Sequence, residues 1–244
     1  MEVAELADKL VAWIQEKVRE AGCRGIVLGM SGGLDSSVLA ALCRRASSEN
    51  VLGIIMPCHS NPQDEEHARL AAEKFGVTTE KVPLEGVFEA FLKVFPGKEA
   101  KPGNSKLAEA NVKVRLRMVT LYYFANQLGY LVAGSSNRSE LFAGYFTKYG
   151  DGGSDILPMG KLVKGQVREL ARFLGVPRPI IDKPPSAGLW HGQTDEYELG
   201  FSYDELDRYL TTGEAIPELK PKFDSMALDS KHKCLPPPVP DFDT

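Results

Sequence analysis

The sequence lacks several patterns that would place it in a specialised class. Its four cysteines are widely separated and include no Cys-x-x-Cys pair, so neither a disulfide framework nor a paired-cysteine zinc site is expected. No run approaches the roughly eighteen apolar residues of a membrane span, and the first residues are acidic and amphipathic rather than basic and then apolar. These absences favour a cytoplasmic protein that does not cross a membrane.

An excess of positive charge is also missing. The formal net charge is −4, which gives no overall attraction to nucleic acid or to an anionic membrane. The 244 residues contain 43% hydrophobic and 25% charged residues, which are ordinary values for a globular chain. We therefore expect a single domain over residues 1–244, with no nucleic-acid or membrane partner.

Short apolar segments alternate along the chain with patterns of helical period. The segments typical of buried strands are residues 25–29, 51–56, 81–84 and 130–134. The patterns typical of helices are residues 3–18, 36–45, 64–75, 87–94, 107–128 and 164–174. This alternation predicts an α/β fold, a doubly wound parallel sheet with helices on both faces, in which ligands bind at the carboxyl ends of the strands.

Other parts of the chain show no such periodicity. Residues 96–106 are polar and rich in glycine and proline, so we expect a flexible loop there. A second loop region is expected over residues 145–158. After residue 174 the sequence turns irregular and proline-rich, which predicts a flexible C-terminal tail from about residue 221.

The first predicted strand is followed by the loop Gly29-Met30-Ser31-Gly32-Gly33-Leu34-Asp35-Ser36-Ser37, which leads into a helix. Glycines let the backbone approach a ligand closely, and free N–H groups at a helix N-terminus point at an anion. Phosphate is the natural ligand, although Asp35 is an unusual neighbour for phosphate unless a divalent cation lies between them. The alternative is a plain turn in which Asp35 or Ser36 is the N-cap.

The loop does not match the common nucleotide-binding signatures. The chain contains neither a Walker A motif nor a Gly-x-Gly-x-x-Gly fingerprint, which disfavours a P-loop NTPase and an NAD-dependent dehydrogenase. The loop instead resembles the pyrophosphate loop of the ATP pyrophosphatases, also called the adenine nucleotide alpha hydrolase-like group. This resemblance implies that ATP is cut between its α and β phosphates and that a carboxylate or carbonyl is activated as its adenylate.

Further motifs narrow the resemblance to one family, the NAD synthetases. They are the segments 111–118 (NVKVRLRM), 134–140 (GSSNRSE), 144–155 (GYFTKYGDGGSD), 164–167 (KGQV), 185–190 (PSAGLW), 193–196 (QTDE) and 232–233 (HK). Their order is that of the family, and they extend over essentially the whole chain.

The resemblance implies an ammonia-dependent NAD synthetase, a ligase that converts deamido-NAD to NAD with ATP and ammonia and releases AMP and pyrophosphate. Glutamine-dependent members carry an additional nitrilase-like domain, for which 244 residues leave no room. Free ammonia, or ammonia from a separate glutaminase, is therefore implied. Members of the family are typically homodimers that bind the dinucleotide near the subunit interface.

The resemblance also implies roles for individual residues, with Mg²⁺ as the cofactor and ATP as a co-substrate. The expected ATP contacts are Gly29, Met30, Ser31, Gly32, Gly33, Leu34, Asp35, Ser36, Ser135, Lys164 and Ser186. The expected Mg²⁺ ligands are Asp35 and Glu140, which offer the hard oxygen donors that Mg²⁺ prefers. The expected deamido-NAD contacts are Arg115, Lys148, Asp155, His232 and Lys233, and no residue is assigned as a general base.

Two departures from the family pattern and two rival functions stay open. Ser135 replaces a threonine and keeps its hydroxyl, whereas Cys234 and Leu235 stand where many relatives carry further arginine. One rival is a tRNA-modifying ligase or thiolase, for which a basic surface and paired cysteines would be typical. The other is a catalytically silent nucleotide-binding protein, which would not require the two metal-directed carboxylates Asp35 and Glu140.

Overall fold

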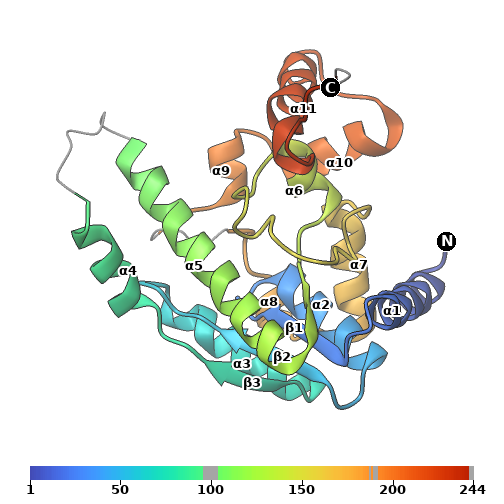
Figure 1. The fold of residues 1–244 in the computed structure, drawn as a ribbon. Helices are drawn as coiled ribbons and strands as arrows, with labels where there is room; N and C mark the ends of the chain where they lie inside the picture. The colour runs from blue at the N-terminus through green and yellow to red at the C-terminus, as the bar shows by residue number, and fades with distance from the viewer. Residues whose placement is uncertain (96–103, 187, 189–191, 242–244) are drawn as a thin grey trace.

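The computed structural model describes residues 1–95, 104–186, 188 and 192–241, and its elements are labelled in Figure 1. The strands are β1 (Gly25–Gly29), β2 (Val51–Ile55), β3 (Thr78–Lys81) and β4 (Tyr130–Ala133). The helices are α1 (Val3–Glu20), α2 (Leu34–Ala46), α3 (Pro62–Phe75), α4 (Glu85–Lys93), α5 (Asn104–Leu128), α6 (Arg138–Ala143), α7 (Lys164–Leu174), α8 (Arg178–Ile181), α9 (Asp195–Leu199), α10 (Tyr203–Thr212) and α11 (Lys220–Cys234).

The four strands form one parallel sheet in the order β3-β2-β1-β4, which confirms the predicted α/β class. The chain runs outward from β1 through β2 to β3 and then returns to place β4 on the other side of β1. This reversal creates a switch point between the carboxyl ends of β1 and β4, where open α/β sheets bind ligands. An isolated parallel bridge between Ala133 and Ile156 continues the pairing just beyond β4.

The central strand β1 is buried on both faces, and its side chains alternate between two helical layers. Ile26 and Leu28 pack in a cluster built from α1, α2, α3 and α7, whereas Val27 packs with Ala125 of α5 on the opposite face. Successive side chains of a strand point to opposite faces, so an unbroken apolar run is what a strand covered on both sides requires. Figure 1 shows α5 and α7 on either side of the strands.

Helix boundaries follow local capping signals in several places. The Asn61 side chain accepts a hydrogen bond from the Gln63 N–H at the start of α3, and Gly76 ends that helix in the left-handed region at φ 66°. Reciprocal capping boxes start α6, between Asn137 and Glu140, and α10, between Ser202 and Glu205.

The C-terminal third differs from expectation. The irregular region after residue 174 contains α8 to α11, and the expected tail from about residue 221 is helical as far as Cys234. Helix α8 packs through Ile180 in the main core, whereas α9 to α11 are stabilised by a separate cluster, in which Phe201, Tyr203 and Phe223 pack together and against α6. Their order therefore depends on contacts between segments distant in sequence, which local periodicity does not reveal.

The expected loop over residues 96–106 can be compared only in part. Residues 96–103 lie outside the described part of the chain, and helix α5 already begins at Asn104. Among the helices that the structure describes, none combines the length and the apolar character needed to cross a membrane.

Candidate functional site

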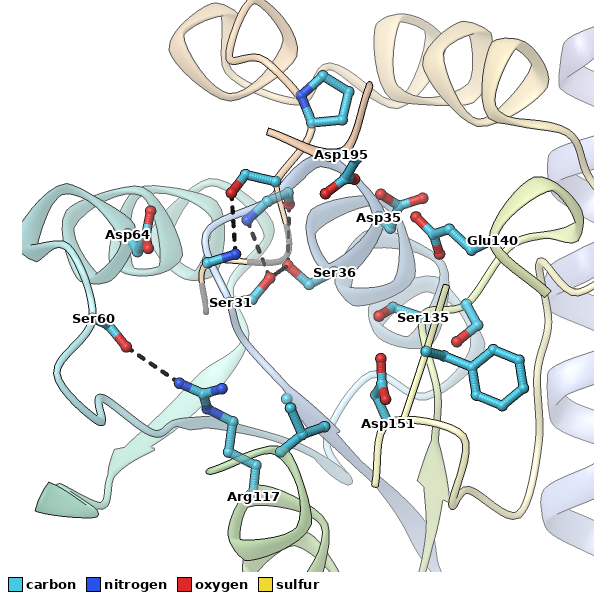
Figure 2. A pocket seen from close by; sticks show the side chains of 18 of the residues that line it. Ser31, Asp35, Ser36, Ser60, Asp64, Arg117, Ser135, Glu140, Asp151 and Asp195 are labelled. Carbon is cyan, nitrogen blue, oxygen red and sulfur yellow. Dashed lines mark hydrogen bonds between the residues drawn. The ribbon is translucent and has the colours of Figure 1, made fainter. Parts of the chain in front are cut away.

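A cavity of about 1670 Å³ opens at the carboxyl ends of the strands, at the switch point between β1 and β4. Its lining comes from the loops that follow β1, β2 and β4, from α5, and from the segment between α8 and α9. Figure 2 shows Asp35 and Glu140 on one side of this cavity and Asp64, Ser60 and Arg117 on the other. The fold thus places the predicted loop where a parallel sheet binds its ligand.

Gly32 lets the loop after β1 pass close to helix α3. Its φ of +74° lies in the left-handed region, which glycine adopts without steric cost. A Cβ at this position would lie 2.0 Å from the backbone oxygen of Asp64. Both the backbone conformation and the close approach therefore require glycine at position 32.

Helix α2 begins without a side-chain cap, because its N-cap residue is Gly33. The nearby hydroxyls are bonded to each other and to Gly33: Ser31 Oγ and Ser36 Oγ share a hydrogen bond of 2.9 Å, Ser31 Oγ accepts from the Gly33 N–H at 3.2 Å, and Ser36 Oγ donates to the Gly33 carbonyl at 3.0 Å. The alternative of a plain turn with Asp35 or Ser36 as N-cap is not what the structure shows. The helix end faces the cavity as an anion-binding site would.

Lys164 brings the two predicted metal-directed carboxylates together. Its Nζ lies 2.5 Å from Asp35 Oδ2 and 2.9 Å from Glu140 Oε1. The lysine side chain is only 3% exposed, and the two carboxylates are 16% and 17% exposed. Residues from α2, α6 and α7 thus meet at a single cation in a poorly solvated place, where charge interactions are strong.

Asn137 connects the same two carboxylates through a second route. Its Nδ2 donates to Asp35 Oδ1 at 2.8 Å, while its Oδ1 accepts a hydrogen bond from the Glu140 N–H at 3.1 Å. Glu140 Oε2 in turn accepts from the Asn137 N–H at 3.3 Å. The capping box of α6 therefore orients Glu140 toward Lys164 and holds Asp35 at the same time.

Lys164 and Glu140 affect each other's protonation. Burial raises the pKa of Glu140 to about 7, Lys164 opposes this rise, and the neighbouring Asp35 adds to it. Burial alone would lower the pKa of Lys164, but attraction from Asp35 and Glu140 outweighs it and holds that pKa above its ordinary value. Lys164 therefore stays cationic, and the cluster has one positive charge for two carboxylates.

The Asp35 and Glu140 pair fits Mg²⁺. Within the described ranges no three His, Cys, Asp or Glu side chains gather as a metal cage, but Mg²⁺ is usually held by one or two carboxylates together with substrate phosphates. Both residues offer hard oxygen donors and already converge on one cation, Lys164 Nζ. The uncapped end of α2 lies beside this pair and is where the phosphates are expected.

Two other predicted ATP contacts also line the cavity. Ser135 lies in the loop after β4, and Ser186 lies in the segment after α8, where its Oγ accepts a hydrogen bond from the Gly188 N–H at 3.1 Å. Residues 187, 189 and 190 of the predicted motif at 185–190 lie outside the described part of the chain. The expected ATP contacts other than Gly32 therefore face one space, from the loop after β1, the loop after β4, the start of α7 and the segment after α8.

The predicted deamido-NAD contacts form a group at the edge of this space. Arg115 Nη2 donates to the Lys148 carbonyl at 3.3 Å, and Lys148 Nζ donates to the His232 carbonyl at 2.7 Å. Lys233 lines the cavity, and its Nζ donates to the Gly144 carbonyl at 2.7 Å. Helix α11 is thus tied to the loop after α6, and these residues come together although they lie far apart in the sequence.

Asp155 stands apart from that group. Its Oδ2 accepts a hydrogen bond from the Val132 N–H at 2.8 Å, and its Oδ1 accepts from the Tyr122 hydroxyl at 2.9 Å. Arg115, Lys148, Asp155 and His232 are not among the residues that line the cavity. Their roles as deamido-NAD contacts stay predictions.

Sequence reasoning missed several polar residues at the site. Arg117 of α5 lines the cavity and donates to the Met56 carbonyl and to Ser60 Oγ, at 3.2 Å in each case (Figure 2). Tyr203 lies under Lys164, with Nζ 5.0 Å from its ring centre, and donates its hydroxyl to Asp195 Oδ2 at 3.1 Å. Only the Asn137 cap carried a local signal, because Asn followed three residues later by Glu is a capping-box pattern.

Comparison with known proteins identifies what the chain is similar to. A family model described as NAD synthase matches residues 6–232. The NH(3)-dependent NAD(+) synthetase of Carboxydothermus hydrogenoformans is 52% identical over 237 residues, which make up 97% of this chain and 97% of that protein. The family match therefore includes every described residue that lines the cavity except Lys233.

Solved structures agree with this similarity. The NMN synthetase from Francisella tularensis superposes with a TM-score of 0.92 at 35% identity, over 99% of this chain and 100% of that chain. The NH3-dependent NAD synthetase from Campylobacter jejuni superposes with a TM-score of 0.83 at 29% identity, again over 99% and 100%.

The raised pKa of Glu140 predicts how stability depends on pH. Because that pKa is about 7 in the folded protein and 4.5 ordinarily, its contribution to stability is full at low pH and is lost as the pH rises through about 7. Glu140→Gln cannot titrate at this position. In metal-free buffer the Tm of the wild type minus that of Glu140→Gln should therefore fall between about pH 4.5 and pH 7.5 and level off above.

Thermal unfolding followed by circular dichroism, with a chelator present, measures this difference. Asp8→Asn, at a carboxylate that is 71% exposed, is the control and should leave the profile unchanged. A Tm difference that rises between about pH 4.5 and pH 7.5 would contradict the raised pKa of Glu140 in the folded protein.

Proposed function

The chain belongs to the NAD synthase family, and from this we propose that it catalyses the ATP-dependent amidation of deamido-NAD by ammonia to give NAD. The observation that carries the proposal is the meeting of Asp35, Glu140 and Lys164 beside the uncapped end of α2, within a chain that matches the family over residues 6–232. The reaction consumes ATP and ammonia and releases AMP and pyrophosphate.

The first step joins two anions. The nicotinate carboxylate attacks the α-phosphorus of ATP, and the bond to the bridging oxygen breaks, so that pyrophosphate leaves and an acyl adenylate forms. The N–H groups at the start of α2 and the hydroxyls of Ser31 and Ser36 can bind the departing pyrophosphate. Lys164 adds a positive charge at the same place, and Mg²⁺, held by Asp35 and Glu140, supplies further charge neutralisation when it is bound.

The second step forms the amide. Ammonia attacks the carbonyl carbon of the adenylate, the bond to the phosphate oxygen breaks, and AMP leaves while the nitrogen loses a proton. Free ammonia, or ammonia from a separate glutaminase, is the nitrogen source.

We expect purified protein to form NAD and AMP in equal amounts when it is supplied with Mg²⁺, ATP, deamido-NAD and ammonium. Chromatography of the nucleotides measures both products. Formation of ADP would contradict the cleavage between the α and β phosphates. Binding of ATP without any amide product would instead favour the silent nucleotide-binding protein.

A second acceptor deserves the same assay, because the superposition with the NMN synthetase from Francisella tularensis has a TM-score of 0.92. The candidate is nicotinic acid mononucleotide, which has the same carboxylate but lacks the AMP half of deamido-NAD. The ratio of kcat/KM for the two acceptors decides between them. Arg115 and Lys148 lie outside the cavity. There they can contact the AMP half of deamido-NAD, which nicotinic acid mononucleotide lacks. We therefore expect deamido-NAD to be the preferred acceptor.

Asp35→Asn tests the metal-binding role. The variant keeps the shape of the side chain but removes a charge from the site, so we expect kcat/KM to fall at least about 100-fold while the protein stays folded. Raising the Mg²⁺ concentration should restore part of the activity if the lost function is metal binding. Near-normal turnover at low Mg²⁺ would contradict the role, and Asp8→Asn again serves as the exposed control.

We further propose that the enzyme is a homodimer formed through the outer face of α5. Arg115, Val119 and Tyr123 follow one another at intervals of four residues, so they lie on one face of the helix. Val119 and Tyr123 are each 58% exposed, which leaves an apolar strip on that face. A second copy seated there would lie beside Arg115 and could complete a dinucleotide site that one cavity does not enclose.

Sedimentation velocity at micromolar concentrations should give twice the 26.7 kDa mass of one chain. Val119→Asp places a charge in the strip and should shift the protein to the monomer. Leu228→Asp is the matched control, because Leu228 is 74% exposed on α11, outside the strip. A monomeric wild type, or a Val119→Asp variant that remains dimeric, would contradict this interface.

We also propose that the enzyme acts in the cytoplasm. The four cysteines are all unpaired, and Cys43 and Cys58 are buried. Free thiols persist in a reducing compartment, where disulfides are rare. The substrates proposed for the site, ATP and a pyridine nucleotide, fit the same location.

A further inference from the structure

Helix α7, which presents Lys164, begins without a cap from its own sequence. Lys164 is the first residue of the helix, and the residue before it, Val163, has no polar side chain. The Val163 N–H is bonded to Gln166 Oε1 at 3.1 Å. The N–H groups of Lys164 and Gly165 therefore need acceptors from elsewhere, since unpaired donors at a buried helix end are costly.

Asp207 of α10 provides these acceptors. Its Oδ2 accepts a hydrogen bond from the Gly165 N–H at 2.7 Å, and its Oδ1 accepts one from the backbone N–H of Lys164 at 3.3 Å. The residue is buried, with 9% of its surface exposed. A carboxylate at a helix N-terminus also interacts favourably with the helix dipole, so Asp207 acts as a cap supplied by another helix.

Ser139 connects the Asp207 cap to helix α6, which carries Glu140. Its hydroxyl donates to Asp207 Oδ1 at 2.5 Å and accepts from the Lys164 N–H at 3.1 Å. Ser139 directly precedes Glu140 in α6 and is fully buried. Asp207 therefore bonds the Ser139 side chain next to Glu140 and the backbone N–H groups at the start of α7, on both sides of the contact between Glu140 and Lys164.

We propose that Asp207 is a positioning residue for the reaction, which holds the start of α7 so that Lys164 projects between Asp35 and Glu140. This inference rests on the proposed function, because it concerns the same site. Asp207 does not line the cavity and makes no hydrogen bond with Asp35 or Glu140. The partners of its carboxylate are Ser139 Oγ and the N–H groups of Lys164 and Gly165. Groups that orient the residues around a metal typically change metal affinity or activity by about 10- to 100-fold when they are replaced.

Asp207→Asn tests the inference while keeping the size of the side chain. The amide can accept one backbone N–H, but it loses the negative charge and turns an N–H₂ group toward one of the present donors. We expect kcat to fall about 10- to 100-fold and the Mg²⁺ concentration for half-maximal activity to rise, with a smaller change in the KM for deamido-NAD. A purely structural defect would instead reduce the fraction of active protein and leave the Mg²⁺ requirement unchanged.

Binding can be measured without turnover. Isothermal titration calorimetry with Mg²⁺ and α,β-methylene ATP, which cannot be cut between the α and β phosphates, should give weaker binding to Asp207→Asn than to the wild type. Asp204→Asn is the matched control on the same helix: its carboxylate is 83% exposed and pairs with Arg168 at 3.1 Å, and it should match the wild type in both assays.

Ser139→Ala keeps the test decisive if Asp207→Asn does not fold. It removes the hydroxyl between Asp207 and the Lys164 N–H but leaves the bond to Gly165, so we expect the same changes at reduced size. Wild-type binding and Mg²⁺ requirement in either folded variant would overturn the positioning role. A wild type that forms no amide with either acceptor would instead overturn the proposed function.

Discussion

The site depends on one cation shared by two carboxylates. Lys164 lies 2.5 Å from Asp35 and 2.9 Å from Glu140, and all three side chains are largely removed from water. Two carboxylates this close would repel each other, and burial would favour their neutral forms. The lysine opposes the effect of burial at Glu140 and holds both carboxylates at one point beside the cavity.

The rest of the fold can be understood as the means of holding this contact. Asp35 is the second residue of α2, Glu140 is the third residue of α6, and Lys164 is the first residue of α7, so all three lie in the first turn of a helix. The switch point of the sheet places β1 beside β4 and brings the first two together. Asn137 at the N-cap of α6 and Ser139 within it, with Asp207 from α10, then orient these residues through hydrogen bonds.

The C-terminal helices α10 and α11 support the site through contacts that the sequence did not predict. Helix α10 supplies the cap of α7, and α11 is tied to the loop after α6 by Lys233 and by the contact between Lys148 and the His232 carbonyl. The aromatic cluster around Tyr203 and Phe223 joins these helices to α6. The segment from about residue 221, which the sequence predicts to be a proline-rich tail, is helical as far as Cys234. This helix, α11, belongs to the framework around the site.

The sequence alone determined the α/β class and predicted the glycine-rich loop before a helix, because these have local signals, whereas the phosphate contacts and the Mg²⁺ ligands Asp35 and Glu140 stay predictions of the family resemblance. Apolar strands between glycines, a glycine-rich turn before a helix, and the ordered motifs of a family are all readable along the chain. Only the tertiary structure decided that Lys164 lies between Asp35 and Glu140 and that Asp207 caps its helix. Those contacts join residues between 24 and 129 positions apart, and the hydrogen bonds and burial that select them exist only once the chain has folded.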